Sequence, residues 1–415
     1  MEEKILTQAF DLKNIFEIGV YIEQGGYKAV EKALLSMTPA EVMGEVKKAN
    51  LRGRGGAGFP AGVKWSFVPQ KPDQPRYLCV NADEGEPGTF KDRYIMSHNP
   101  HLLLEGSIIA SYAVGIHLAF IYIRGEYEAV AQRLEGAITE AHKKGFLGKN
   151  ILGTGFDLDI VVHRGAGAYI CGEETGLLES IEGKRAYPRL KPPFPASIGL
   201  FQSPTVINNV ETLANVPFII LNGAEWFVKK GLPQDGGTRI FGVSGMVRKP
   251  GIYELPLGTS LKTIIFEYAG GMMDGKELKA VIPGGMSAPV LKADEIDLPM
   301  DFDSLAGANS MLGSAAIIVI DGKTPIFEVL KVVTKFYSHE SCGQCTPCRL
   351  GTSWINKIVK RIAQGEGEKG DIDTIVRLAS NIKGKTLCPL GDAAALPILS
   401  ICQKFKEELE GYLPR

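Results

Sequence analysis

Four cysteines near the carboxyl end constrain this chain more than any other feature of its sequence. Cys342, Cys345 and Cys348 stand at C-x2-C-x2-C spacing, and Cys388 follows after 39 intervening residues, with a proline directly behind it. Three thiolates at this spacing can wrap three corners of an iron–sulfur cubane, and a remote cysteine followed by proline can close the fourth. The pattern predicts a [4Fe-4S] cluster in the last part of the chain.

Zinc is the first alternative, but structural zinc sites usually pair one C-x2–4-C motif with a second such pair. A thioredoxin-like redox pair needs only two cysteines within a βαβ unit, and the flanking residues predict none. Four buried cysteines without a ligand are the remaining alternative. Cys79, Cys171 and Cys402 have no such neighbours, so we expect them to be core residues.

Alternating strand and helix signals predict an α/β domain over residues 1–236. Short apolar runs at 77–81, 118–123 and 158–162 alternate with helical patterns at 102–113, 126–144 and 174–181. Such alternation is typical of a parallel sheet covered by helices. Before it, Thr38, Pro39 and Glu41 form a capping box, which predicts a helix ending near Ala49.

The remaining residues divide into two smaller units. Residues 237–324 contain short β-like runs at 239–243, 251–255, 278–283 and 316–320 around one helix at 261–268. Turn signals separate the runs, which predicts a small α+β module. Residues 325–415 carry helical patterns at 326–338, 350–364, 372–382 and 393–410. Four helices with short links predict a terminal bundle.

Composition excludes several classes of protein. The net charge of -1, from 46 basic and 47 acidic side chains, argues against a general affinity for nucleic acid or anionic membranes. The longest apolar stretches, 113–123 and 315–320, are shorter than the ~20 residues of a spanning helix. The first residues lack the basic and apolar regions of a secretory signal, so we expect reduced thiols. The 49 glycines belong in tight turns or where backbone approaches a ligand.

Residues 53–60, Gly-Arg-Gly-Gly-Ala-Gly-Phe-Pro, satisfy G-x-G-x-x-G. A dinucleotide fingerprint should follow a strand, but here a helix precedes the motif. A kinase loop would carry valine where Pro60 stands. The glycines would still let backbone amides approach a phosphate, whose charge Arg54 and Lys64 could neutralise. A tight turn without a ligand is the alternative.

Three further segments follow strands or open helices. Asn81, Asp83, Glu84 and Glu86 come directly after a predicted strand, where ligands of open α/β sheets bind. A solvated acidic turn is the alternative. Residues 165–176 connect a strand to a helix, as a ligand loop at a helix N-terminus does. Residues 208–212 begin with two asparagines before a helix, which an ordinary asparagine cap would also explain.

Taken together and in order, five segments resemble one family, the flavoprotein NADH-oxidising component (the F subunit) of respiratory NADH:quinone oxidoreductase, complex I. They are residues 51–60, 81–88, 172–176, 208–212 and 341–349. The resemblance runs from about Leu51 to the end. It implies a Rossmann-like FMN domain, then a small β-grasp (ubiquitin-like) module of the soluble-ligand-binding type, then a four-helix cluster domain. These parts agree with the boundaries at 236 and 324.

The resemblance also implies roles for individual residues toward FMN and NADH. FMN would be cradled and neutralised by Gly53, Gly55, Gly56 and Lys64. Its ring and ribityl chain would be surrounded by Asn81, Asp83, Tyr169, Gly172 and Glu173. Its phosphate end would be held by Asn208, Asn209 and Thr212. Phe59, Phe67 and Phe194 would stack around the adenine of NADH, although residues of this type alone suggest core positions. Glu86 and Glu174, the candidate catalytic carboxylates, would face the nicotinamide half. Arg54, Ala57, Gly58, Glu84 and Ile207 complete the candidate set.

The implied reaction passes a hydride from NADH to FMN, followed by single electrons to the cluster; the protein supplies orientation and electrostatics. The resemblance further implies a partner with a [2Fe-2S] cluster on a thioredoxin-like fold, other peripheral-arm subunits of complex I, and a place on the cytoplasmic side of the inner membrane. The first alternative is the diaphorase component of an NAD-linked hydrogenase or formate dehydrogenase, which often carries extra ferredoxin-like or thioredoxin-like extensions. A non-enzymatic scaffold that binds zinc and a nucleotide is the second.

Overall fold

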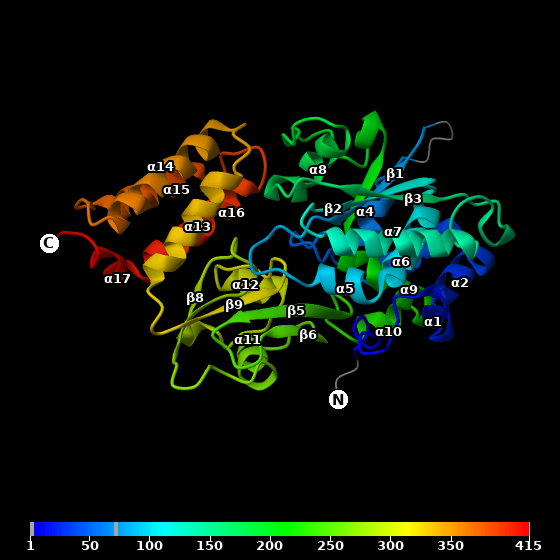
Figure 1. Cartoon of the computed structure of the whole chain (residues 1–415), viewed down its shortest axis with the longest axis horizontal. Coiled ribbons are helices and arrows are strands. Elements are labelled where there is room, and N and C mark those ends of the chain that lie inside the picture. Colours follow the sequence, from blue (N-terminus) through cyan, green and yellow to red (C-terminus); the bar gives the residue numbers. More distant parts are fainter. Residues whose placement is uncertain (1–3, 70–73, 415) are drawn as a thin grey trace.

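The first sheet brings together two strand ends that lie far apart in the sequence. The computed structural model, which describes residues 4–69 and 74–414, places four parallel strands in the order β3-β2-β1-β4 (Figure 1). The strands are β1 (Tyr77–Ala82), β2 (Leu118–Ile123), β3 (Asp159–Arg164) and β4 (Thr205–Asn209). The chain adds β2 and β3 on one side of β1 and β4 on the other, so the strand order reverses between β1 and β4. Open parallel sheets bind ligands beyond the carboxyl ends of strands at such a reversal.

Helices cover both faces of this sheet. They are α1 (Ile18–Glu23), α2 (Lys28–Ser36), α3 (Pro39–Lys48), α4 (Ala61–Ser66), α5 (Asp92–His98), α6 (Pro100–Val114), α7 (Glu128–Lys143), α8 (Glu174–Ile181), α9 (Val210–Asn222) and α10 (Ala224–Val228), with short turns η1 (Ile151–Gly153), η2 (Tyr169–Gly172) and η3 (Leu200–Gln202). Because strand side chains alternate between faces, Leu78 and Val80 join the core of α2, α3, α6, α7 and α9. Cys79 joins the opposite core with α8.

A second sheet of five strands follows, in the order β6-β5-β9-β7-β8. Its elements are β5 (Thr238–Gly245), β6 (Gly251–Pro256), α11 (Leu261–Thr263), η4 (Ile264–Tyr268), β7 (Leu278–Ile282), β8 (Leu291–Lys292), η5 (Ala293–Glu295), α12 (Phe302–Gly307) and β9 (Ala316–Asp321). The first and last strands, β5 and β9, pair in parallel at the centre, and the other neighbours are antiparallel. This unit has its own apolar core.

The chain ends in antiparallel helices that lie to one side of both sheets in Figure 1. They are α13 (Ile326–Glu340), α14 (Thr346–Ala363), α15 (Asp371–Ile382), α16 (Leu390–Lys404) and α17 (Lys406–Glu410). Their core is continuous with the α8 face of the first sheet. The bundle therefore packs directly against the sheet that ends in the predicted ligand loops.

The structure confirms most of the predicted elements but differs from the prediction in several places; the helix predicted over 350–364, for example, begins at Thr346. The helix predicted over 393–410 begins earlier, at Leu390, and is interrupted at Phe405, where φ is -124° and the backbone leaves the helical region. Strand β4 was not predicted, because only two apolar residues, Val206 and Ile207, stand between Pro204 and the two asparagines. Across the described residues, every helix is too short or too polar to cross a lipid bilayer.

Candidate functional site

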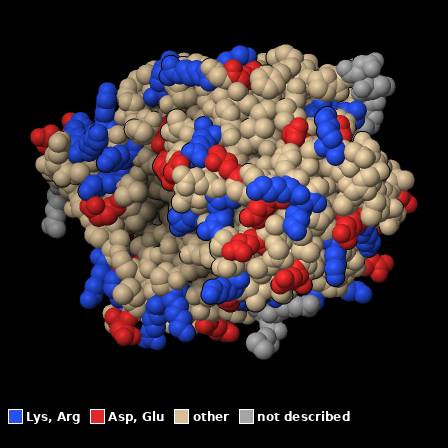
Figure 2. Space-filling model, turned by 45° about the vertical axis from the view of Figure 1, so that its right-hand side comes forward, with Lys and Arg blue, Asp and Glu red and all other residues tan. Residues whose placement is uncertain are grey.

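A cavity of about 890 Å³ opens at the reversal point of the first sheet. This volume lies in the upper part of the range of about 300–1,000 Å³ that is typical of ligand pockets. All of the predicted cofactor residues line it except Gly56: Gly53, Arg54, Gly55, Ala57, Gly58, Phe59, Lys64, Phe67, Asn81, Asp83, Glu84, Glu86, Tyr169, Gly172, Glu173, Glu174, Phe194, Ile207, Asn208, Asn209 and Thr212. On the face shown in Figure 2, acidic and basic side chains are interspersed around a hollow.

The ends of β1 and β4 form the floor of this cavity. Asn81 and Asn209 are register partners in the parallel ladder. Asn81 Nδ2 donates to the Gly172 carbonyl at 2.9 Å, which ties β1 to turn η2. Asn209 caps α9 by accepting from the Glu211 amide, and its Nδ2 donates to Asp92 at 2.6 Å. The asparagine cap that served as the alternative is therefore present, and it lies inside the cavity.

The glycine loop closes over β4. The Arg54 amide donates to Thr212 Oγ1 at 2.8 Å, and the Gly53 amide donates to the Phe59 carbonyl at 2.9 Å. A Cβ added to Gly55 would lie only 3.0 Å from the Cβ of Asn209, so any larger side chain would push the loop away from the strand. The glycines thus allow the loop to pack closely against the end of β4, while the approach of its amides to a phosphate stays a prediction.

Arg54 does not have the predicted role of neutralising a phosphate. Its guanidinium is fully buried and donates to Asp235 at 2.6 Å and to the Gly236 carbonyl at 2.7 Å. A buried cation needs such a partner to offset its lost hydration. The ion pair therefore anchors the glycine loop to the segment before β5, and the prediction for this side chain is wrong.

The acidic segment after β1 is largely withdrawn from water, with Glu84 buried and Asp83 and Glu86 half-buried, which argues against a solvated turn. Glu84 accepts hydrogen bonds from the Asp92 and Arg93 amides at 2.7 and 3.2 Å. Burial, together with the charge of Asp92, raises the pKa of Glu84 to about 7. Burial also raises the pKa of Asp83 to about 7 against the opposing effect of Arg124. Among the described residues, Asp83 Oδ2 is buried without a hydrogen-bond partner.

The two candidate catalytic carboxylates have different surroundings. Glu86 accepts from the Tyr169 hydroxyl at 2.6 Å and from the Ser287 amide at 2.7 Å, and burial raises its pKa. Burial would also raise the pKa of Glu174, but two lysines outweigh it and lower that pKa. These are Lys64 at 3.0 Å and Lys191 at 2.8 Å. Glu174 is thus an anion that neutralises a pair of cations.

Three aromatic side chains stand at the cavity without core packing. Phe59, Phe67 and Phe194 line it while remaining 48%, 57% and 59% exposed. The rings of Phe59 and Phe67 are 6.1 Å apart. Exposed phenylalanines are unfavourable in water, so this arrangement suits a planar ligand between them.

Sequence reasoning missed several residues of the cavity wall. They are Gly85, Thr89, Lys91, Asp92, Ile170, Lys191, Pro195, Ala196, Ser197, Ser314, Pro389, Leu390 and Ala393. Lys91 is fully buried and pairs with Asp92 and Glu211, each at 2.7 Å. The charged run of residues 91–93 directly after the acidic segment was the signal that could have revealed it. Pro389 and Leu390 carry no such signal, because hydrophobic residues beside Cys388 suggest only core packing.

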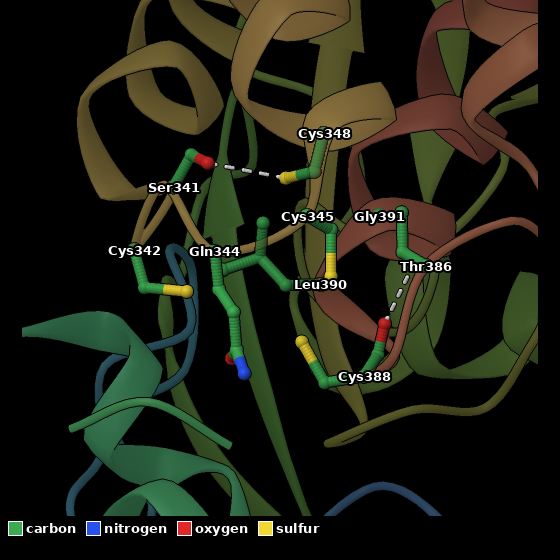
Figure 3. A pocket seen from close by; sticks show the side chains of 9 residues that line it. All are labelled: Ser341, Cys342, Gln344, Cys345, Cys348, Thr386, Cys388, Leu390 and Gly391. Atoms are coloured by element: carbon green, nitrogen blue, oxygen red, sulfur yellow. Dashed lines mark hydrogen bonds between the residues drawn. The ribbon is translucent and has the colours of Figure 1, made fainter. Parts of the chain in front are cut away.

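The four predicted cluster cysteines line one small pocket with Ser341, Gln344, Thr386, Leu390 and Gly391. Figure 3 shows their sulfur atoms around a shared space between the α13–α14 turn and the segment before α16. The Leu387 amide donates to Cys345 Sγ at 3.3 Å, and Ser341 Oγ lies 3.2 Å from Cys348 Sγ. Hydrogen bonds of this kind tune cluster potentials.

The chemistry of this donor set fits a cluster better than zinc. Within the described residues, no three His, Cys, Asp or Glu side chains lie close enough together to hold one metal ion. Zinc needs four ligands at about 2.0–2.3 Å from one atom, whereas each cluster thiolate binds a different iron. Burial raises the pKa of Cys388 to about 12 and also raises that of Cys348. Bound iron would reverse both shifts, because ligating thiols are deprotonated.

Three family models match successive parts of the chain. Residues 46–218 match the Nuo51 FMN-binding domain, residues 240–291 the SLBB domain, and residues 328–412 the NADH-ubiquinone oxidoreductase-F iron-sulfur binding region.

Relatives match over nearly the whole chain. It is 53% identical to the second NADH-quinone oxidoreductase F subunit of Rhizobium meliloti (strain 1021), covering 100% of this chain and 98% of the relative. It is 51% identical to the F subunit of Mycobacterium tuberculosis (strain ATCC 25618 / H37Rv), covering 92% and 86%. A chain from the crystal structure of an NAD+-reducing [NiFe]-hydrogenase in the H2-reduced state superposes with a TM-score of 0.87 at 34% identity, covering 100% of this chain and 67% of that one.

Proposed function

Because this chain belongs to the family of NADH-quinone oxidoreductase F subunits, we propose that it is the NADH dehydrogenase flavoprotein of such a complex. In this proposal it oxidises NADH with FMN and passes electrons singly to a [4Fe-4S] cluster. One observation carries the proposal: Leu390 lines both the large cavity and the cysteine pocket. A cavity suited to a nucleotide and a pocket suited to a cluster thus share a wall.

The residues of the cavity fit FMN. The unpartnered Asp83 Oδ2 offers a hydrogen-bonding group for a ligand, and a pKa near 7 lets Asp83 donate as well as accept. Asn81, Asn208 and the amides of the glycine loop would hold the flavin and its phosphate. When bound, FMN takes up a hydride and gives up electrons one at a time. Cys342, Cys345, Cys348 and Cys388 would hold the cluster.

NADH would bind against the exposed aromatic side chains. Phe59, Phe67 and Phe194 would enclose the adenine, and burial of their rings would favour the bound state. Glu86 and Glu174 would face the nicotinamide half. Glu86, held by Tyr169 and Ser287, has little freedom to move, so it would orient the ligand.

The second sheet supports the β-grasp assignment. A parallel pair of first and last strands at the centre, flanked by antiparallel strands, with a helix between the second and third, is the arrangement of ubiquitin-like folds. The match of residues 240–291 to the SLBB domain also supports it. We therefore divide the chain into residues 1–236, 237–324 and 325–415.

The proposed function is tested on the purified chain reconstituted with iron and sulfide. Acid should release FMN, identified chromatographically, and NADH should bleach the flavin absorption and produce the electron paramagnetic resonance signal of a reduced [4Fe-4S] cluster. Recovery of FAD, a stoichiometric content of zinc in place of iron, or unchanged spectra with NADH would contradict the proposal. Zinc is colourless, so the same spectra test the scaffold alternative.

Preference for NADH over NADPH should depend on Glu174. Its carboxylate neutralises Lys64 and Lys191, and its charge would disfavour an added 2′-phosphate from across the cavity, because NADPH carries that group on its adenine-side ribose. In Glu174→Gln, Lys191 would keep its ion pair with Glu173 at 2.8 Å, whereas Lys64 would lose its carboxylate partner and could attract that phosphate. We expect the NADPH-to-NADH ratio of kcat/KM to rise on the order of tenfold. Comparable values for both nucleotides in the unsubstituted protein would refute the assignment.

The electrons need a next acceptor. We propose a partner subunit with a [2Fe-2S] cluster on a thioredoxin-like fold, together with other peripheral-arm subunits, and attachment to the cytoplasmic side of the inner membrane through them. Isolation of the native complex is the test. A complex without any second iron–sulfur protein would overturn this partner assignment.

A diaphorase role in an NAD-linked hydrogenase is the second candidate, favoured by the TM-score of 0.87 to a chain of an NAD+-reducing hydrogenase. This role ranks second because the chain is 53% identical to an NADH-quinone oxidoreductase relative but only 34% identical to the hydrogenase chain. If the native complex is isolated with hydrogenase subunits, the diaphorase role becomes the better supported of the two functions.

A further inference from the structure

The last residue of α13 reaches from the cluster region to the nucleotide cavity. The Tyr169 amide donates to Glu340 Oε2 at 3.1 Å, between residues that are 171 positions apart in the sequence. Glu340 ends α13, two residues before Cys342, and its side chain is only 17% exposed. One hydrogen bond thus joins turn η2 to the start of the cysteine loop.

Turn η2 forms part of the cavity wall through Tyr169, Ile170 and Gly172. As the first residue of this turn, Tyr169 has an amide that no residue within the turn can accept. Glu340 supplies the missing acceptor through a carboxyl oxygen.

The same helix also supports the Tyr169 ring. Its centroid lies 5.2 Å from that of Phe336 and 6.1 Å from that of Tyr337, both in edge-on geometry. The Tyr169 hydroxyl in turn binds Glu86. Helix α13 therefore holds Tyr169 by ring and backbone, and it continues directly into the turn that carries Cys342.

We propose that Glu340 is a positioning residue for electron transfer between the flavin site and the cluster. By holding the Tyr169 amide, it fixes the flavin-side turn relative to the cysteine loop. Single-electron transfer depends on that spacing, whereas hydride transfer inside the cavity does not. The inference rests on the proposed function and adds to it a residue that lines neither the large cavity nor the cysteine pocket.

The test compares Glu340→Ala with Glu340→Gln, which removes the charge that acts on Asp83 just as alanine does but keeps an acceptor oxygen. The full chain, loaded with FMN and cluster, is mixed with NADH. Cluster reduction is followed by freeze-quench electron paramagnetic resonance, and flavin-level oxidation is followed with a small-molecule acceptor. Glu328→Ala is the control, since Glu328 is exposed on the same helix and pairs only with Lys331 among the described residues.

In Glu340→Ala we expect cluster reduction to slow on the order of tenfold, because small misplacements of reacting groups carry large rate penalties. Flavin-level oxidation, FMN content and cluster content should stay within about twofold, and Glu340→Gln should restore most of the rate. An unchanged rate in Glu340→Ala, or a proportional loss of both activities in both variants, would overturn the proposal. If the unsubstituted chain fails to oxidise NADH, the proposed function itself fails.

Discussion

At the scale of single residues, the folded protein disfavours the charged form of the Asp83 carboxyl group. Burial raises its pKa from 3.8 to about 7, and the charges of Glu126 and Glu340 act in the same direction. Between pH 3.8 and about pH 7, Asp83 keeps its proton in the native state, whereas in the unfolded chain it has released it. The resulting stabilisation is complete below the unfolded pKa and is lost as the pH rises through the folded pKa.

We therefore expect the flavin-free protein to lose thermal stability between about pH 5 and pH 8, and Asp83→Asn to lose less. The neutral amide has no proton to release, and one pKa unit corresponds to about 1.4 kcal/mol. Melting temperatures of both proteins at the two pH values are the measurement. Parallel pH profiles would show that Asp83 does not titrate in this range. Glu84 is unchanged in the variant, so its own contribution cancels.

Cys388→Ser should separate hydride transfer from onward electron transfer. Serine is a poor ligand for iron, so the cluster should be lost or changed in potential. Oxidation of NADH with an acceptor that takes electrons from FMN should continue, while reduction of the partner should nearly stop. Flavin content, both activities and the cluster spectrum are the readouts.

The structure adds a constraint to this experiment. The sequence placed Cys388 away from the flavin pocket, but its neighbours Pro389 and Leu390 line that cavity. Flavin content must therefore be measured first. Cys402→Ser is the matched control, because Cys402 is buried on α16 outside the cysteine pocket. An unchanged cluster spectrum and normal partner reduction in Cys388→Ser would show that Cys388 is not a ligand.

At the scale of elements, the contact of α6 with α9 determines where the end of β4 lies. A Cβ added to Gly106 in α6 would come within 2.0 Å of the Leu213 carbonyl in α9. The two helices therefore touch backbone to backbone. Helix α9 begins at Val210, directly after Asn208 and Asn209, so its position sets theirs.

We expect Gly106→Ala to destabilise the protein by about 1–3 kcal/mol, as overpacking of a core does, and to weaken FMN binding. Gly136→Ala is the control, since that position in α7 is exposed with nothing within 4 Å of the added atom. There alanine should stabilise the helix by about 0.5–1 kcal/mol. Denaturant unfolding and flavin titration are the measurements. Equal effects of the two substitutions would contradict the packing argument.

At the scale of the whole molecule, the amino-terminal segment joins the first and second units. The carboxylate of Glu254 in β6 accepts from the amides of Ile5, Leu6 and Thr7 at 2.7–3.0 Å. It also accepts from the hydroxyls of Thr7 and Thr238. Buried amides of this kind need a partner, so one carboxylate fixes the segment to the second sheet.

Glu254→Ala would leave several buried amides without an acceptor, at a cost of about 1–3 kcal/mol for each. We expect fast hydrogen exchange at residues 5–7 and a lower melting temperature, while Glu267→Ala, an exposed position in the same unit, should change neither. Protected amides at residues 5–7 in Glu254→Ala would contradict the assignment.

The sequence by itself determined the grouping of the four cysteines, the order of most elements although not of β4, and most of the cavity. Ligand spacing, capping boxes and the alternation of strands and helices are local properties, readable within a few turns of chain. The glycine loop, the strand ends and the cysteine motif therefore lay where the linear pattern indicated. For the three phenylalanines the residues alone suggested core positions, whereas the family resemblance correctly implied a place at the cavity.

Only the tertiary structure decided which partner each buried charge has and which segments share a wall. Arg54 pairs with Asp235, Glu340 holds the Tyr169 amide, and Leu390 lines two pockets at once. The residues of each pair are more than 150 positions apart, so no pattern within a short stretch of sequence predicts that they are in contact. These contacts form because of how the bundle and the second sheet pack against the first sheet. Once the polar groups are buried, each one needs a hydrogen-bond or ion-pair partner, because burial without a partner costs free energy.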